Sequence, residues 1–531
     1  MLLALAAAAF AGPRPADPVE ARLSWSLREA RALHARGEID AFRFRRPVPL
    51  DVDGLSVVIH GDPATLLPAL HEAGFAVEAV GRHAVQAWSP WERLLDTAEL
   101  PGATRVREPW RASAKEVVSE GYDAVMLQDW HDQGIDGTGV TVGVVDVGFA
   151  GWDSLGDELG DDVTTDFSRG SENATEHGAA VAEIVHDFVP GASLYLATFS
   201  TDVEFEEVLV EMADAGVDVI NGSIGFDNVW HADGTSTLTL AVEDAVDAGV
   251  AYFAAAGNEN DKYRVGELAY VDGSEVLAIG GEWEIWAYGG GFPHVSFRWS
   301  EPFGEAAQDI DLALLNEDDS VCAQSLEVQD GGGWPYEEAY AEGCDEWVRV
   351  VVYSTTGADV DGLEGYVYSY NTLDPAYWTD SEDLTLPGDT ISGVSVGAYY
   401  ADDDSVAEYS SRGPTNDGRT KPDVVAPTAV TTVSYGSPFE GSSSATPHAA
   451  GLGALWVAAS NRHGEPKAMK GWMIANARDI GPDGEDNESG AGAIEANEPP
   501  ATTCGCDAGG GAGVAGAGVL AAALLSRRRR R

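Results

Sequence analysis

The sequence predicts an α/β protein in which a doubly wound parallel sheet carries helices on both faces. Short apolar runs alternate with amphipathic helical stretches over residues 134–265, which is the pattern of successive β-α units. Two other segments depart from this pattern. An α+β unit is expected over about residues 50–108, and residues 267–371 have the period-2 alternation of a β-sandwich. With 531 residues, the chain is too long for a single hydrophobic core.

The N-terminal part of the sequence has two sections. Residues 1–11 are apolar and end in Ala9-Phe10-Ala11, which is typical of a signal peptide. A basic start is missing, so a short core helix is the alternative. Residues 12–118 contain the α+β core, with a strand predicted over Leu55–His60. A helix is predicted over Pro63–Ala73, because Asp62 can cap its first free N–H groups.

The predicted α/β domain consists of residues 119–266 and 372–478, which flank the β-rich segment. In the first part, we expect strands at residues 142–146, 193–198, 217–221 and 251–255, and helices at residues 177–186, 203–215 and 238–248. Functional side chains of such a sheet gather at the carboxyl ends of its strands. Residues 479–503 are polar and bear Glu, Gly and Pro, which predicts a linker.

The β-rich segment, residues 267–371, contains four clear strand-like runs at residues 295–299, 309–315, 349–353 and 365–369. Cys322 and Cys344 lie within it at a spacing that suits a disulfide across a β-layer, and two cysteines alone make a poor zinc site. Asp309 and Asp311 are candidate ligands for a structural calcium ion, but a solvated strand end is the favoured explanation of this pair. The alternative to a separate sandwich is an expansion of the α/β domain.

The C-terminal tail, residues 504–531, combines three unusual features. Cys504 and Cys506 precede an apolar run of 18 residues, Ala508–Leu525, and five arginines end the sequence. Eighteen residues is the short end of a membrane span, and terminal arginines fit the positive-inside rule. An ordinary C-terminal anchor and a disordered glycine-rich tail are the alternatives.

The charge of the chain is concentrated in one part. Residues 12–118 hold 14 basic and 15 acidic side chains, whereas residues 119–526 hold 12 basic and 73 acidic ones. Nucleic-acid binding is therefore disfavoured, because no basic face is available to neutralise phosphates. Solubility explains such acidity, and so does work in salty water, where screening removes the self-repulsion.

Three segments carry nucleophilic chemistry. Ser443 lies in a glycine-flanked turn that starts a small-residue helix, where free N–H groups favour negative charge. Asp146 ends a buried strand and His177 opens a helix, so the chain supplies the carboxylate and the base that activate a serine. The order Asp146, His177, Ser443 is the triad order of the subtilisin type.

These segments and four others make the sequence resemble the subtilisin-like serine peptidases, or subtilases (peptidase family S8), over about residues 134–476. The other segments are residues 219–225, 254–258, 409–414 and 421–427. The resemblance implies that Asn258 contributes to the oxyanion hole and that Ser223-Ile224-Gly225 binds the substrate as a strand. Three positions depart from the family pattern, Val147, Ala179 and Ser442, and these changes concern rate and local geometry.

The resemblance also carries expectations for the other parts. Residues 12–118 resemble a propeptide that guides folding and blocks the cleft, so that the chain's own N-terminal part is an inhibitory partner. The β-rich segment resembles a pre-peptidase C-terminal domain, here inserted into the catalytic domain. The tail resembles the surface-sorting signals of myxobacteria, with Cys504 as the place of processing by sorting machinery. These likenesses imply an exported protein that is anchored at the cell surface or outer membrane, with extracellular release as the alternative. They also imply that it acts on protein or peptide substrates and requires no cofactor for its chemistry.

Two other functions compete with a serine endopeptidase. An inactive subtilase scaffold that serves as a surface binding protein is opposed by the presence of Asp146, His177, Asn258 and Ser443. An α/β-hydrolase esterase has the order Ser, Asp, His and a G-x-S-x-G turn, and this chain has Ala445 where the second glycine would stand. No charged residue lies within Ser223–Gly225, which favours an apolar or broad primary preference.

The acidic part of the chain predicts stabilisation by salt. Like charges crowd residues 119–526, which hold 12 basic and 73 acidic side chains. The Debye length falls from about 10 Å at 0.1 M salt to about 3 Å at 1 M. We therefore expect the melting temperature, followed by circular dichroism, to rise with added sodium chloride. A flat or falling curve up to 1 M salt would contradict this expectation.

Overall fold

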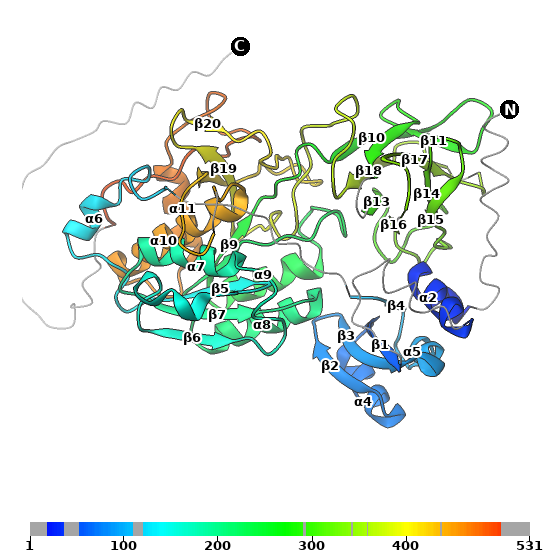
Figure 1. Cartoon of the computed structure of the whole chain (residues 1–531), viewed down its shortest axis with the longest axis horizontal. Coiled ribbons are helices and arrows are strands. Elements are labelled where there is room, and N and C mark those ends of the chain that lie inside the picture. The colour runs from blue at the N-terminus through cyan, green and yellow to red at the C-terminus, as the bar shows by residue number, and fades with distance from the viewer. Residues whose placement is uncertain are drawn as a thin grey trace, which may run out of the picture.

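The computed structural model describes residues 18–36, 53–109, 120–289, 294–340, 343–357, 359–435 and 438–500. These residues form three units that lie side by side, each built around its own sheet (Figure 1). An eight-stranded sheet forms the central unit. A four-stranded sheet forms the N-terminal unit, and a nine-stranded sheet forms the unit that is inserted into the central one.

The central sheet has the strand order β20-β19-β9-β8-β5-β7-β6, and β21 pairs with β19. Its strands are β5 (Thr141–Asp146), β6 (Val163–Asp166), β7 (Ser193–Thr198), β8 (Val219–Gly222), β9 (Ala251–Ala255), β19 (Val394–Tyr400), β20 (Ser405–Val406) and β21 (Val424–Thr428). Every pair is parallel except β19 with the short edge strand β20. The carboxyl ends of β5, β8 and β9 therefore lie next to one another at one edge of the sheet.

Helices cover both faces of this sheet, as the alternation along β5 requires. Val142 and Val144 belong to the core shared with α7 (His177–Phe188), α10 (Ser442–Ser460) and α11 (Pro466–Asn476). Val145 belongs to the core on the opposite face, with α8 (Asp202–Asp214) and α9 (Thr237–Asp247). The doubly wound α/β class predicted from the sequence is confirmed.

The N-terminal unit is an antiparallel sheet of order β2-β3-β1-β4. Its elements are η1 (Glu20–Arg22), α2 (Trp25–Ala35), β1 (Gly54–His60), α4 (Pro63–Ala73), β2 (Ala76–Val80), β3 (Ala84–Pro90), η2 (Trp91–Arg93), α5 (Leu94–Glu99) and β4 (Arg105–Arg107). The sequence places the core of this unit at about residues 50–108, whereas α2 also contributes Leu27 and Ala30 to it. The other side of the sheet packs on α8, where Val58, Ala79 and Ala84 contact Val203.

The inserted unit is all-β over its described residues. Its strands are β10 (Tyr263–Tyr270), β11 (Val276–Ile279), β12 (Ile285–Tyr288), β13 (His294–Trp299), β14 (Asp311–Leu315), β15 (Val321–Ser325), β16 (Tyr336–Tyr340), β17 (Trp347–Tyr353) and β18 (Glu364–Ser369). All its strand pairs are antiparallel, and β10 joins two groups of strands because it pairs with β18 and then with β11. The first strand starts at Tyr263, a few residues before the expected boundary at 267. A disulfide joins Cys322 to Cys344.

Two expectations about polar segments are wrong. Asp309 and Asp311 are not at a solvated strand end, because they are only 5% and 3% exposed. Residues 479–500 are not a free linker, because they pack on the central unit. Ala493 and Ile494 are buried, and Ala493 exchanges both backbone hydrogen bonds with Arg478.

The signal-like residues 1–11 and the tail, residues 504–531 with Cys504, lie outside the described residues. Within the part of the chain that the structure describes, no helix is long and apolar enough to cross a membrane.

The contact between α7 and α10 predicts the effect of one methyl group. A Cβ added to Gly451 would overlap the side chain of Phe188 in α7. We expect Gly451→Ala to lower the free energy of unfolding by about 1–3 kcal/mol through overpacking, measured by urea denaturation.

Gly471→Ala is the matched control. Gly471 lies exposed in α11, and an added Cβ would meet nothing within 4 Å. The same substitution there should raise the free energy of unfolding by up to about 1 kcal/mol, because alanine is the better helix former. Equal effects at the two glycines would contradict close packing of α7 on α10.

Candidate active site

The carboxylate of Asp146 and the imidazole of His177 form the centre of the site. Asp146 is the last residue of β5 and His177 is the first residue of α7, and their Oδ2 and Nδ1 atoms are 2.7 Å apart. Both side chains are fully buried. The second carboxylate oxygen of Asp146 accepts the Val147 backbone N–H at 2.8 Å. These two bonds fix the ring, and they leave His177 Nε2 without a hydrogen-bond partner among the described residues.

Ser443 lies in the first turn of α10, after Gly441 at the N-cap position. Gly441 has a φ of 127°, a conformation that side-chain-bearing residues rarely adopt. The Ser443 hydroxyl donates to the carbonyl oxygen of Ser223 at 2.9 Å and is not bonded to His177. The hydroxyl proton of Ser443 therefore points toward Ser223, which follows β8. The hydroxyl group must rotate about the Ser443 side-chain bond to face the imidazole of His177.

A proline explains why the segment after β8 is held so closely to Ser443. Pro447 has no N–H, so it cannot bond the Ser443 carbonyl four residues before it in the helix. That carbonyl accepts the hydroxyl of Ser223 instead, at 2.9 Å. The amide of Asn221 in turn donates to the Ser223 hydroxyl at 3.0 Å. Ser223 thus joins the end of β8 to the first turn of α10 by two hydrogen bonds.

Asn258 follows β9 and meets the same turn. Its Oδ1 accepts the Ser442 backbone N–H at 2.7 Å, and the Ser442 hydroxyl accepts the Gly257 N–H at 3.2 Å. With Oδ1 occupied, the amide Nδ2 of Asn258 is the group left to donate to an oxygen beside Ser443. The Asn258 side chain is partly exposed, as a group that binds a substrate oxygen has to be.

Further residues, which the sequence analysis did not single out as site residues, hold the turn in place. The hydroxyl of Tyr409 accepts the Gly441 N–H at 2.8 Å, and the hydroxyl of Thr428 accepts it at 2.9 Å. Tyr409 lies in a stretch that resembles a family segment, and Thr428 directly follows another, so the resemblance gave their surroundings without their role. Phe439 packs against His177 with ring centroids 5.4 Å apart. The sequence carries no signal for this contact.

Glu183 connects α7 to residues 433–434, a non-regular segment before the turn that bears Ser443. Its side chain is buried within α7, and its carboxylate accepts the backbone N–H groups of Val433 at 2.6 Å and Ser434 at 2.9 Å. The helix that begins with His177 is therefore tied to the segment that leads into Phe439. A glutamate among alanines and valines was the one available signal for this role.

The structure brings together most of the predicted site residues. Asp146 contacts His177 at the end of β5, and Ser443 contacts Ser223 after β8. Asn258, after β9, contacts the residue before Ser443, so these side chains come from three neighbouring strand ends. Ile224 and Gly225 follow Ser223 in the chain and are buried. The disulfide of Cys322 and Cys344 is in the inserted unit, apart from this site. For metals, the described residues contain no group of three or more His, Cys, Asp or Glu side chains suited to hold an ion.

His448 lies in α10 one turn after the nucleophile, and it is fully buried. Its Nδ1 is 2.8 Å from the Ser444 carbonyl oxygen, and its ring packs against Phe188 at a centroid distance of 5.2 Å. Burial lowers the pKa of His448 from the ordinary 6.5 to about 3. The ring is therefore neutral and donates from Nδ1, which is a structural role and not a catalytic one.

This lowered pKa predicts a loss of stability in acid. Below pH 6.5 the unfolded chain binds a proton at His448, whereas the folded chain does not until about pH 3. Between pH 7.5 and pH 5, the free energy of unfolding of the wild type should fall by about 2 kcal/mol more than that of His448→Gln. Urea denaturation at the two pH values measures this difference. Parallel pH profiles of the two proteins would contradict the assignment.

Comparison with known proteins places the chain in a family. A model of the Subtilase family matches residues 137–492. The serine protease AprX of Bacillus subtilis (strain 168) is 34% identical over 142 residues, which cover 22% of this chain and 31% of AprX. The chain thus spans less than a third of the length of that curated relative.

A solved structure shares the fold. The CspB protease of Clostridium perfringens superposes with a TM-score of 0.52 at 14% identity, covering 71% of this chain and 97% of CspB. Fervidolysin from Fervidobacterium pennivorans, a keratinolytic enzyme related to subtilisin, gives a TM-score of 0.47 at 14% identity, over 85% of this chain and 61% of fervidolysin. The family match covers most of the chain and includes every residue of the site, and the chain therefore belongs to the subtilase family.

Proposed function

We propose that the protein is a serine endopeptidase that hydrolyses peptide bonds through an acyl-enzyme. The observation that carries this proposal is the buried pair of Asp146 and His177, 2.7 Å apart, with His177 Nε2 unpartnered among the described residues. The His177 ring packs against Phe439, which lies four residues before Ser443. An imidazole held by a carboxylate on one nitrogen is a general base on the other.

In the proposed reaction, Ser443 rotates from the Ser223 carbonyl toward His177 Nε2 and loses its proton to that nitrogen as its oxygen attacks the peptide carbonyl. Asp146 keeps the Nδ1–H tautomer and stabilises the imidazolium that forms. His177 then gives the proton to the leaving amine. Water, activated by the same nitrogen, releases the acyl group from Ser443.

Two donors would stabilise the oxyanion. The Ser443 backbone N–H lies at the start of α10, where the helix dipole favours negative charge. The Asn258 Nδ2 is the second donor, because its Oδ1 is held by the Ser442 N–H. One such donor contributes about 3–4 kcal/mol to transition-state stabilisation.

The substrate is proposed to bind as an extended strand along Ser223–Gly225, through main-chain hydrogen bonds. These three residues are buried and carry no charge, which supports an apolar or broad primary preference. The proposed mechanism uses no metal or cofactor. A structural calcium ion away from the reacting groups is compatible with it.

We also propose roles for the flanking parts. The N-terminal unit would act as a propeptide that the enzyme removes, and the inserted unit would be a domain of the pre-peptidase C-terminal type. Export, surface anchoring and processing at Cys504 by sorting machinery rest on the sequence of residues 1–11 and 504–531 alone. The competing proposal, an inactive scaffold that binds partners at the surface, has no observation in its favour within the site.

Three substitutions test the catalytic proposal. Ser443→Ala should abolish peptide hydrolysis, labelling by a fluorophosphonate and removal of residues 12–118, because no nucleophile remains. His177→Ala should cost nearly as much, since triad members act as a unit. Asn258→Ala should retain labelling and lose about 10²–10³-fold in kcat.

Ser444→Ala is the matched control for the run of three serines. The Ser444 hydroxyl is buried one residue after the nucleophile and has no hydrogen-bond partner among the described residues. This variant should keep both labelling and hydrolysis. Full activity of Ser443→Ala, or labelling that moves with Ser444, would disprove the assignment of the nucleophile.

A further inference from the structure

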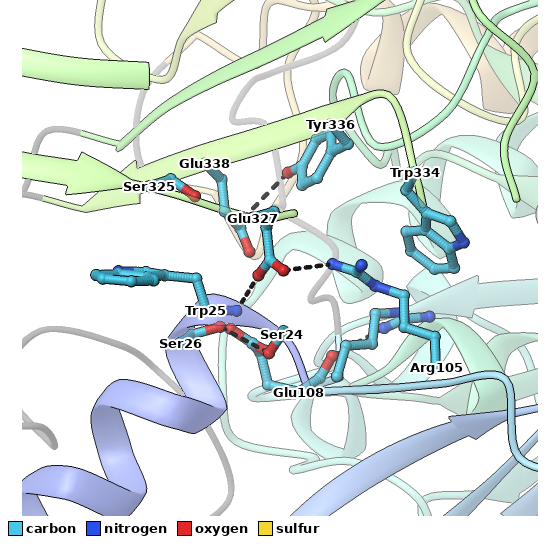
Figure 2. Close-up of a pocket in the computed structure, with 11 residues that line it drawn as sticks. Ser24, Trp25, Ser26, Arg105, Glu108, Ser325, Glu327, Trp334, Tyr336 and Glu338 are labelled. Atoms are coloured by element: carbon cyan, nitrogen blue, oxygen red, sulfur yellow. Dashed lines mark hydrogen bonds and ion pairs between the residues drawn. The ribbon is translucent and has the colours of Figure 1, made fainter. Parts of the chain in front are cut away.

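The N-terminal unit touches the inserted unit as well as the central unit. Helix α2 lies beside the inserted unit, near β15 and β16 (Figure 1). Figure 2 shows the contact between them, with Glu327 of the inserted unit between Trp25 and Arg105 of the N-terminal unit. Glu327 lies in the segment that connects β15 to β16.

The carboxylate of Glu327 is the centre of this contact. One oxygen accepts the backbone N–H of Trp25, the first residue of α2, where the helix dipole favours an anion. The other oxygen lies 3.4 Å from the guanidinium of Arg28 and 3.6 Å from that of Arg105. The side chains of all three charged residues are at most 13% exposed. The network is therefore largely shielded from water.

Hydrogen bonds within the inserted unit hold the backbone at Glu327 in place. The Glu327 backbone N–H donates to the carboxyl group of Glu337 at 3.0 Å, and Gln329 Nε2 donates to the same group at 2.9 Å. Burial raises the pKa of Glu327, whereas the charges of Arg105 and Arg28 lower it. The carboxylate thus depends on arginines of the other unit for its compensating charge.

Aromatic rings complete the contact. Trp25 packs against an apolar cluster of the inserted unit that includes Leu326 and Tyr353. The guanidinium of Arg105 lies 4.7 Å from the ring centroid of Trp334, within cation–π distance. Arg28 also donates to the Leu326 carbonyl oxygen at 3.3 Å. The inserted unit therefore offers arginine a carboxylate, a carbonyl and a tryptophan face, and all three are used.

We propose that Glu327, the Leu326 carbonyl and Trp334 form a guanidinium-binding pocket of the inserted unit, and that this pocket retains the N-terminal unit on the rest of the chain after the connecting segment is cut. The charges of the two parts suit this role, because residues 12–118 are nearly neutral whereas residues 119–526 hold 73 acidic and 12 basic side chains. The inference rests on the proposed removal of the N-terminal unit.

The contact with α8 lies next to this pocket, because Arg107 lines the pocket, with its guanidinium 5.9 Å from the ring centroid of Trp334, and also reaches α8. There, Arg107 pairs with Asp202 at 2.5 Å, and Glu206 accepts the Arg82 backbone N–H at 2.6 Å. Two contacts in different units hold the N-terminal unit at two places. Loss of the pocket should therefore speed release of the N-terminal unit without abolishing its binding to α8.

The test separates retention from catalysis. A full-length Ser443→Ala chain, with residues 112–118 replaced by the recognition sequence of an orthogonal protease, is immobilised through its N-terminus and cut. The release of the remainder is followed on a biosensor. We expect Glu327→Gln and Arg28→Gln each to raise the dissociation rate constant by about 30-fold or more, because each breaks a buried charge pair.

Glu317→Gln is the matched control, since Glu317 is an exposed carboxylate of the same inserted unit. It should change the rate constant by no more than about 3-fold. The double variant Glu327→Gln/Arg28→Gln should be released little faster than either single variant, because both lose the same interaction.

Arg28→Gln also controls for misfolding of the inserted unit, because Arg28 belongs to the N-terminal unit and the inserted unit keeps its own sequence in this variant. Release of Glu327→Gln and Arg28→Gln at the rate of the Glu317→Gln control would overturn the proposal, and so would complete release of the parent on cutting. Because no peptidase activity is used, failure of the catalytic proposal leaves the outcome unchanged.

Discussion

The burial of α10 is the constraint on which the rest of the structure depends. Of its 19 residues, all but Ala458 are buried, so the helix has no solvent face. Such a helix must be covered on every side, and the sheet, α7 and α11 cover it. Gly451 allows α7 to approach closely, because any side chain there would overlap Phe188. A helix enclosed in this way cannot roll or slide, and the first turn that carries Ser443 is fixed with it.

Because the first turn of α10 is buried, each of its polar groups needs a hydrogen-bond partner from a neighbouring segment. The missing N–H of Pro447 frees the Ser443 carbonyl, and Ser223 satisfies it. The free N–H groups of Gly441 and Ser442 find Tyr409 and Asn258. The hydrogen bonds that satisfy this buried helix end are thus the same bonds that hold Asn258 and Ser223 beside Ser443. The stability of the turn and the geometry of the proposed site have one physical cause.

The sequence predicted those parts that follow from local pattern. The helix Pro63–Ala73 matches its prediction, because Asp62 caps it and Gly74 ends it in a left-handed conformation. Asp146 and His177 could be placed because each lies where a regular element ends or begins. The helix of Trp25–Ala35 was missed because its apolar residues are held by a sheet far along the chain. Residues 479–500 resemble a linker in composition. Their place in the central unit depends on long-range contacts, such as the backbone hydrogen bonds to Arg478 and to the segment at Val425, and composition does not reveal these.

The insertion is tolerated because its two ends are neighbours. The first strand, β10, pairs with the last, β18, in a register that sets Tyr263 opposite Tyr368, so the chain leaves and rejoins the central unit at nearly one place. That place is five residues after Asn258. The hydroxyl of Tyr368 donates to Asp227, two residues after the substrate segment, at 2.9 Å. An all-β unit with its own core is therefore attached close to both Asn258 and the segment Ser223–Gly225, while its far side reaches the N-terminal unit. The inserted unit therefore contacts the N-terminal unit through Glu327 at one end, and through Tyr368 it contacts the central unit beside the proposed active site at the other.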